Sequence, residues 1–169
     1  MNQFACTIVP LVFLISSPSL SLKAFSTPLF ARASQTTKAS QTKAYVKGWD
    51  VTVTTVRYLG RQVQGKYELY EAADSWIAVT VTCTNTTGKR QRSDESPMSS
   101  ISAELIDTYG RKHNVKEREL KYDSGLLSKP YELNESRTEV WLFDVNSGTQ
   151  ASQLLLDSFD ENGVRLTLW

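Results

Sequence analysis

The sequence has few of the residues that usually carry chemistry. Its 169 residues include one histidine and two cysteines, so a disulfide scaffold or a histidine-cysteine metal site has almost no ligands available. The chain also lacks an excess of charge of either sign, because 19 Lys and Arg residues are balanced by 18 Asp and Glu residues. Without a field of one sign, nothing recruits nucleic acid or an anionic membrane surface. We therefore expect no nucleic-acid partner, no cofactor and no metal.

Long apolar runs are missing as well. The longest, residues 4–15, is shorter than the roughly 20 residues that a helix needs to cross a membrane, but it suits a secretory signal. A small-x-small cleavage pattern ends at Ala33, and a second candidate ends at Ala24. We predict a signal peptide over residues 1–33, which would be the only part of the chain to contact a membrane.

Acidic residues are absent before Asp50, which also suits an organelle transit peptide. Transit peptides are amphipathic, however, whereas the apolar run is apolar on every face. We expect a secreted, periplasmic or cell-envelope protein, with the plastid or thylakoid lumen as the alternative. Residues 34–47 are rich in Ser, Thr, Gln and Lys and predict a flexible linker, so the folded domain is expected over residues 48–169.

What the sequence does contain is alternation of period two, the pattern of half-buried strands. Trp49, Val51 and Val53 share one face, and Val56 falls out of phase, which predicts a bulge near Thr54-Thr55. Residues 75–84 are the strongest strand. One face carries Ile77, Val79, Val81 and Cys83, and the other, expected to be wet, carries Trp76, Ala78, Thr80, Thr82 and Thr84.

Further strands are expected between turn residues. Residues 137–145 predict a central strand covered on both faces, and Asn162-Gly163 predicts a tight hairpin near the end of the chain. Residues 89–99 are predicted to be a loop, and residues 111–131 are predicted to hold at most one weak edge strand. About seven strands at spacings near ten residues predict an all-β fold, an antiparallel β-sandwich.

The order of these motifs resembles a known family. The motifs are W-x-V-x-V at residues 49–53, W-I-A-V-T-V-T-C-T-N-x-T at 76–87, L-I-D-x-x-G-R at 105–111 and W-L-F-D-V at 141–145. They are similar to the framework of the telokin-like, immunoglobulin-like domains of exported bacterial proteins and lipoproteins. The resemblance covers residues 48–169 and implies an immunoglobulin-like sandwich in an exported protein. Most such domains have no assigned function, and a fold does not by itself give one.

Individual residues favour structural roles. His113 is interpreted as an exposed histidine entering a strand after a turn, and Cys83 as a buried structural thiol. The last turn carries a cluster of polar residues: Asp157, Asp160, Glu161 and Asn162. Their spacing does not match an EF-hand loop, so turn chemistry is favoured over calcium binding.

Two basic runs and two sequons remain. Residues 89–92 and the basic residues of 111–118 have acidic neighbours in sequence, and both are interpreted as solvated loops. Asn85 and Asn134 begin N-x-S/T triplets, which are glycosylation acceptors in a eukaryotic secretory pathway.

The resulting hypothesis is a non-enzymatic binding or interaction module outside the cytoplasm. No catalytic, cofactor-binding or metal-binding residues are predicted, and the partner is expected to be a protein or a glycan. Residues 89–99 and 111–131 are the expected contact surfaces. One alternative is an accessory subunit of a larger exported or thylakoid-lumen complex. Another is a small hydrolase that uses paired carboxylates such as Glu117 and Glu119, which share a strand face.

Overall fold

The computed structural model describes residues 36–37, 42–121, 128–157 and 163–168. The chain divides into two units, Met1–Phe30 and Ala31–Trp169, and all described residues belong to the second. The expected signal peptide therefore lies outside the described residues, as do Asp160, Glu161 and Asn162. None of the helical segments that the structure describes is long and apolar enough to cross a membrane.

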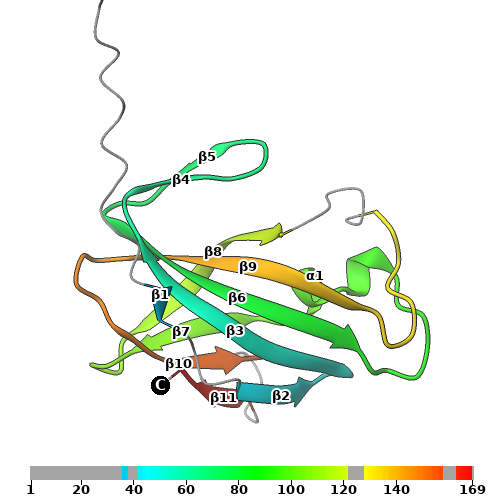
Figure 1. Ribbon diagram of the computed structural model, residues 1–169. Coiled ribbons are helices and arrows are strands. Elements are labelled where there is room, and N and C mark those ends of the chain that lie inside the picture. Colours follow the sequence, from blue (N-terminus) through cyan, green and yellow to red (C-terminus); the bar gives the residue numbers. More distant parts are fainter. Residues whose placement is uncertain (1–35, 38–41, 122–127, 158–162, 169) are drawn as a thin grey trace, which may run out of the picture. The chain divides into compact units, whose positions relative to one another are not determined.

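The described chain folds into an antiparallel β-sandwich (Figure 1). Its strands are β1 (Thr36–Thr37), β2 (Thr42–Val46), β3 (Trp49–Leu59), β4 (Gln62–Gln64), β5 (Leu69–Glu71), β6 (Ser75–Asn85), β7 (Ala103–Asp107), β8 (Lys112–Leu120), β9 (Ser136–Val145), β10 (Ala151–Leu156) and β11 (Val164–Thr167). Between β6 and β7 lie a short 3-10 turn, Ser93–Glu95, and one helical turn, α1 (Pro97–Ser100). Strands β1 and β2 fall within residues 34–47, the stretch expected to be a linker.

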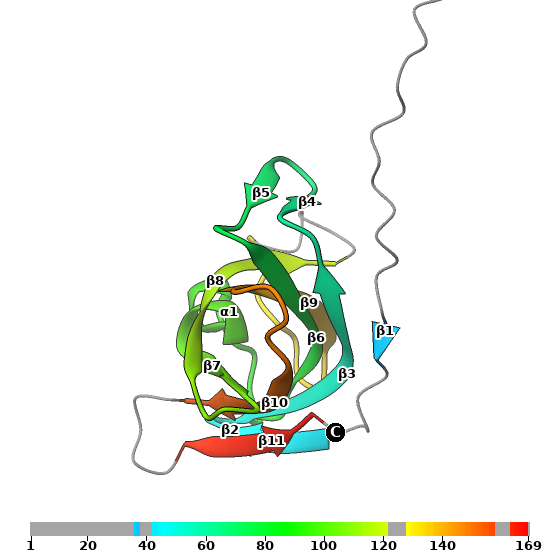
Figure 2. The ribbon, with the colours of Figure 1, turned by 90° about the vertical axis from the view of Figure 1, so that its left-hand side faces the viewer.

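Strand β8 joins the two layers of the sandwich. One layer contains β1, β2, β3, β6 and β9, and the other contains β7, β10 and β11. Residues 112–114 of β8 pair with β7, whereas residues 115–120 pair with β9, and the register shifts between Val115 and Glu117. The expectation of one edge strand in residues 111–131 holds for residues 115–120, which pair with β9 alone among the described strands, but residues 112–114 also join β8 to β7, which the charged sequence did not indicate. Figure 2 shows both layers curving around the shared interior.

The remaining edges of the two layers meet along β2 and β11. The Thr42 hydroxyl donates a hydrogen bond of 3.0 Å to the carbonyl oxygen of Thr167. Residues Lys47 and Gly48 connect β2 to β3 with φ angles of 49° and 84°, as a two-residue hairpin of type I′ requires. A β carbon at Gly48 would collide with the Thr87 side chain, so glycine is also the residue that fits there.

The main core lies between the two layers, and it confirms several predicted faces. The register of β3 against β6 shifts between Val53 and Thr55, which confirms the predicted bulge. The core includes Val51, Val53, Val56, Val79, Val81, Leu105, Trp141, Phe143, Leu154, Leu156 and Leu166. Strand β9 pairs with both β6 and β8, as expected for a central strand.

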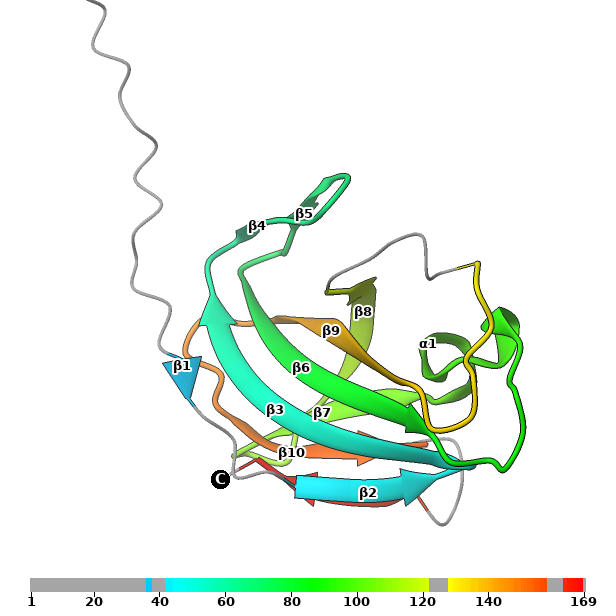
Figure 3. The same ribbon diagram turned by 45° about the vertical axis from the view of Figure 1, so that its right-hand side comes forward.

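A second apolar cluster lies on the outer face of β6 and β9, and we call it the outer cluster. Its buried members are Ala72, Trp76, Ala78 and Leu142, with Leu59, Val63, Tyr70 and Val140 packed around them. The β4–β5 hairpin bends over this end of the sheet and covers it (Figure 3). Trp76, Ala78 and Thr80 are at most 4% exposed, so the expectation of a wet outer face was wrong for these three residues, although Thr82 and Thr84 remain partly exposed.

The last two strands form the predicted hairpin but not the predicted turn. Leu156 pairs with Val164, so the connection runs over residues 157–163 rather than through a two-residue turn at Asn162-Gly163. Asp157 begins this connection with a φ of 56°, and its amide donates to the Ser102 carbonyl oxygen at 2.6 Å.

Candidate functional site

The two expected contact segments come together at one end of the sandwich. Gln91 and Tyr131 exchange two backbone hydrogen bonds, each 2.9 Å long. We call residues 86–102, between β6 and β7, the connector. The guanidinium of Arg118 donates to three connector carbonyl oxygens: Pro97 at 2.8 Å, Met98 at 3.0 Å and Ile101 at 2.7 Å. Strand β8 therefore fixes the connector through one side chain.

An open cleft of about 630 Å³ lies where β8 leaves β7, and we call it the connector cleft. Its volume falls in the roughly 300–1,000 Å³ range of small-ligand sites. It is lined by Lys47, Met98, Ser99, Ser100, Ile101, Ser102, Ala103, Glu104, Asn114, Val115, Lys116, Arg118 and Asp157. Figure 3 shows α1 beside the end of the sandwich where β7 and β8 separate.

A smaller hollow of about 210 Å³ continues this surface along the connector. Its lining residues are Lys47, Trp49, Lys89, Gln91, Glu95 and Ser100, so it shares Lys47 and Ser100 with the connector cleft. The two hollows place polar side chains of both expected contact segments on one continuous surface.

Most charges of the connector cleft are already neutralised. Lys47 Nζ lies 2.6 Å from Asp157 Oδ1, and Lys112 Nζ lies 2.9 Å from Glu104 Oε2. Arg118 is occupied by the connector carbonyls. Within the described ranges, Lys116 is exposed and has no ion-pair partner, so the lining of the cleft is left with one uncompensated positive charge.

Behind the cleft, a carboxylate is buried in the main core. Glu139 is 0% exposed; its Oε2 accepts a hydrogen bond of 2.7 Å from Trp141 Nε1, and its Oε1 accepts one of 3.3 Å from the Tyr131 hydroxyl. Burial raises the pKa of Glu139 despite these hydrogen bonds, and burial also raises the pKa of Tyr131. A carboxylate held in this way is closed to a ligand, so it supports packing rather than acid-base chemistry.

Two arginines complete this buried polar cluster, which we define as Arg118, Tyr131, Arg137, Glu139 and Trp141. The Arg118 guanidinium lies 4.5 Å from the centre of the Trp141 ring, and that of Arg137 lies 3.8 Å from the Tyr131 ring. Burial lowers the pKa of Arg118. Arg118 had been expected in a solvated loop, and that expectation was wrong because it points inward; Arg90 and Arg92 are exposed, as expected.

His113 is not exposed, contrary to expectation. Its side chain is 15% exposed, and its Nε2 lies 3.3 Å from Asp107 Oδ2. The same carboxylate accepts hydrogen bonds from the Tyr109 and Arg111 amides and from Arg111 Nε, and these interactions outweigh burial and lower the pKa of Asp107 to about 2. His113 and Asp107 therefore hold the β7–β8 turn together.

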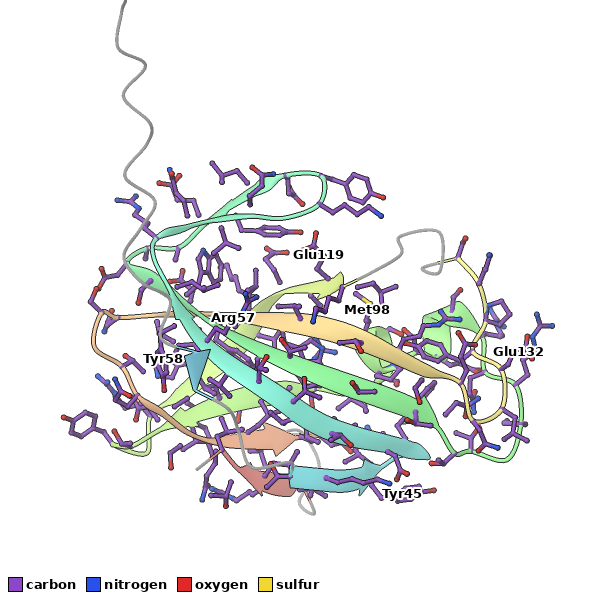
Figure 4. All side chains as sticks on the ribbon, viewed as in Figure 1. Tyr45, Arg57, Tyr58, Met98, Glu119 and Glu132 are labelled. Carbon is purple, nitrogen blue, oxygen red and sulfur yellow. The ribbon has the colours of Figure 1, made fainter. Side chains whose placement is uncertain are left out.

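The Glu117–Glu119 pair lies away from the cleft. The Glu119 carboxylate accepts a hydrogen bond of 2.6 Å from the Lys66 amide, which anchors the β4–β5 hairpin. Figure 4 shows Glu119 on the hairpin side of β8, with Met98 nearer α1. Burial raises the pKa of Tyr70, and the charges of Glu119, Glu68 and Glu117 raise it further. Neither carboxylate lines one of the two hollows, and Glu119 is a contact of the hairpin.

The remaining candidates have clear places. Cys83 is a buried free thiol whose pKa is raised by burial, as expected for a structural cysteine. Asn85 is 0% exposed and donates to the Lys89 and Glu132 carbonyl oxygens at 2.8 and 3.1 Å, whereas Asn134 is exposed in a turn. In the part of the chain that the structure describes, no group of three His, Cys, Asp or Glu side chains could hold a metal ion.

Sequence reasoning missed the buried polar cluster, although a signal for it existed. Arg137 and Glu139 have the same parity as Trp141 in β9, and Trp141 had been assigned to a covered face. Alternation alone would therefore place Arg137 and Glu139 in the interior. Charged residues are rarely fully buried, and this general rule argues against such a placement.

Comparison with known proteins assigns no family to the chain. No protein-family model and no curated protein matches the sequence. Two solved structures are similar: an uncharacterized β-sandwich protein from Clostridium difficile 630 and a conserved hypothetical protein from Bacillus anthracis. The first has a TM-score of 0.49 and 15% identity, covering 75% of this chain and 89% of its own. The second has a TM-score of 0.46 and 13% identity, covering 79% and 97%.

Proposed function

We propose that the chain is an exported, non-enzymatic binding module, built as a telokin-like, immunoglobulin-like sandwich, whose connector cleft holds the ligand. The observation that carries this proposal is the cleft itself, which places three serines, Asn114 and Lys116 around about 630 Å³. Among its lining residues that the structure describes there is no histidine or cysteine, and both carboxylates are ion-paired. Such a lining favours recognition through hydrogen bonds over a reaction.

The chemistry of the surface favours a protein ligand over a glycan. Sugar binding commonly uses an exposed aromatic face, because an aromatic ring presents apolar area together with a polar edge. Trp49, the aromatic residue of the smaller hollow, is 2% exposed, and none of the described residues that line the connector cleft is aromatic.

The binding role is tested with a cleft-blocking variant. Asn114 is exposed and lines the cleft, so Asn114→Trp fills the space without disturbing a described hydrogen bond. Thr167→Trp, at an exposed position of β11, is the matched control. Immobilised wild type and Thr167→Trp should retain the same component of an envelope fraction, and Asn114→Trp should not. Equal retention by all three proteins contradicts a role of the cleft in binding.

Export is the second part of the proposal and has its own test. The sequence pattern supports cleavage after Ala33, so the mature protein should begin at Ser34, with Phe25 as the second candidate start. Intact-mass analysis of cell fractions measures this directly. Full-length protein in the cytosol contradicts it.

A subunit role in a larger exported complex is the second candidate function, and the β4–β5 hairpin favours it. Tyr67 is 72% exposed and Leu69 is 52% exposed on this hairpin. Aromatic and apolar side chains displayed together are typical of protein contacts. Chemical cross-linking in whole cells should then yield a stable adduct that the double variant Tyr67→Ser, Leu69→Ser loses.

A further inference from the structure

We propose that the connector cleft takes an extended, acidic peptide segment of a partner protein, which adds as a strand to the free edge of β8. This inference rests on the proposed function, because it names the ligand class of the same cleft.

The edge of β8 is open because the strand changes partners. Residues 112–114 pair with β7, and residues 115–120 pair with β9 alone among the strands that the structure describes. The N–H and C=O groups of a strand point to its two sides, so about half of those in residues 115–120 point away from β9. An edge of this kind is a template for strand addition.

The open edge borders the connector cleft. Asn114, Val115, Lys116 and Arg118 line it from β8, and residues 102–104 line it from the other side. Met98, Ile101 and Val115 supply apolar lining between the polar groups. Alternate side chains of an added strand would point into this space, while its backbone would bond to β8.

The geometry of the edge favours a short, flexible peptide over a second copy of the chain. The register shift between Val115 and Glu117 interrupts the strand, and the connector, held by Arg118, lies beside it. A bulge and neighbouring lysine and inward-pointing arginine residues are features that prevent a long, flat sheet edge from docking. A few extended residues can follow such an edge.

Charge gives the peptide its acidic character. Lys47 and Glu104 are paired with Asp157 and Lys112, which leaves the Lys116 ammonium uncompensated at the edge. An Asp or Glu side chain of the peptide would therefore pair with the Lys116 ammonium and fix the register of the peptide along β8. A basic peptide would be repelled.

The first test is selection from a phage-displayed library of random heptapeptides against the purified domain. Enriched peptides should be rich in β-branched residues, carry Asp or Glu and lack central proline. They should bind wild type and Thr167→Trp equally and Asn114→Trp at least about tenfold more weakly. Lys116→Glu should weaken them about tenfold, whereas Arg165→Glu, which reverses an exposed charge on β11, should have no effect.

The second test uses the backbone of the best enriched peptide. Two N-methylated versions of this peptide are compared, one modified at its odd-numbered and one at its even-numbered residues. One version should lose binding and the other should keep it, because only one set of amides faces β8. Cleft-dependent binding that is equally sensitive in both parities overturns strand addition but leaves the proposed function intact. No cleft-dependent peptide, or a dimer by analytical ultracentrifugation that Asn114→Trp dissociates, also overturns it. Failure of the proposed function itself is scored separately, by the envelope retention experiment.

Discussion

Two regions of β9 reverse the usual distribution of polar and apolar side chains over the faces of a sheet. Near its start, the inward side chains are the buried charges of Arg137 and Glu139. Further along, the outward side chains are Val140 and Leu142, which belong to the outer cluster. The polarity of a face is thus set by what covers it locally, a polar connector at one end and the β4–β5 hairpin at the other.

The two regions also differ in how their polar atoms are satisfied. In the buried polar cluster, Glu139 accepts from both Tyr131 and Trp141. In the outer cluster, Trp76 Nε1 is buried and has no acceptor among the described residues. The first region therefore combines packing with hydrogen bonds to a buried carboxylate, whereas the buried side chains of the second contribute mainly apolar area.

Removal of the Glu139 carboxylate should have the largest effect. Glu139→Ala leaves the Trp141 N–H and Tyr131 hydroxyl without their acceptor and removes the negative charge that acts on Arg118, and it should cost about 3–5 kcal/mol in the free energy of unfolding. Glu139→Gln keeps an acceptor oxygen and should cost less. Urea denaturation measures both variants, and equal losses would show that the hydrogen bonds contribute nothing.

The outer face should respond differently at its two ends. Thr80→Asp places a charge at a 4% exposed position and should cost several kcal/mol, whereas Thr82→Asp, at a partly exposed position, should cost about 1 kcal/mol. The comparison is made from the denaturation midpoints. Equal midpoints would mean that the hairpin does not cover the outer cluster in solution.

Cys83→Ser should have an intermediate effect. The thiol is 0% exposed in the main core, and a hydroxyl in its place should cost about 1–3 kcal/mol. Cys83→Ala removes the polar atom and serves as the control for lost volume. Rapid modification of native Cys83 by a thiol reagent would contradict its burial.

Asp107 should give a small effect that depends on pH. Its folded-state pKa of about 2 lies below the ordinary value of 3.8, so its contribution to stability is present above about pH 4 and is lost as the pH falls toward 2. The difference in unfolding free energy between wild type and Asp107→Asn should therefore shrink over this interval. Asp94→Asn, in an exposed ion pair, is the control and should show little change.

Much of the sandwich could be predicted from the sequence because apolar alternation is its main signal. The inner face of β6, the bulge in β3 and the central place of β9 all follow from side chains that repeat every second residue. Strand β8 could not be predicted in this way. Its pairing depends on backbone bonds to two different partners, and its Arg118 and Glu119 side chains bond to backbone groups distant in sequence.

The candidate site was predictable only in outline. Residues 89–99 and 111–131 were expected as contact surfaces from their irregular composition, and the structure brings them together. The cleft between them depends on Arg118, whose role becomes visible only when the connector carbonyls surround it. Pairings between a side chain and distant backbone atoms leave no periodic trace in a sequence.

The contact between β2 and β11 has a consequence for protein engineering. Because Thr42 and Thr167 are hydrogen-bonded, β2 and β11 are neighbours. A short linker could therefore join residue 168 to residue 42. New termini could then open between Tyr67 and Glu68, both exposed on the β4–β5 hairpin. Such a circular permutant keeps the strands from β2 to β11 beside their present partners and places both chain ends in the connection between β4 and β5.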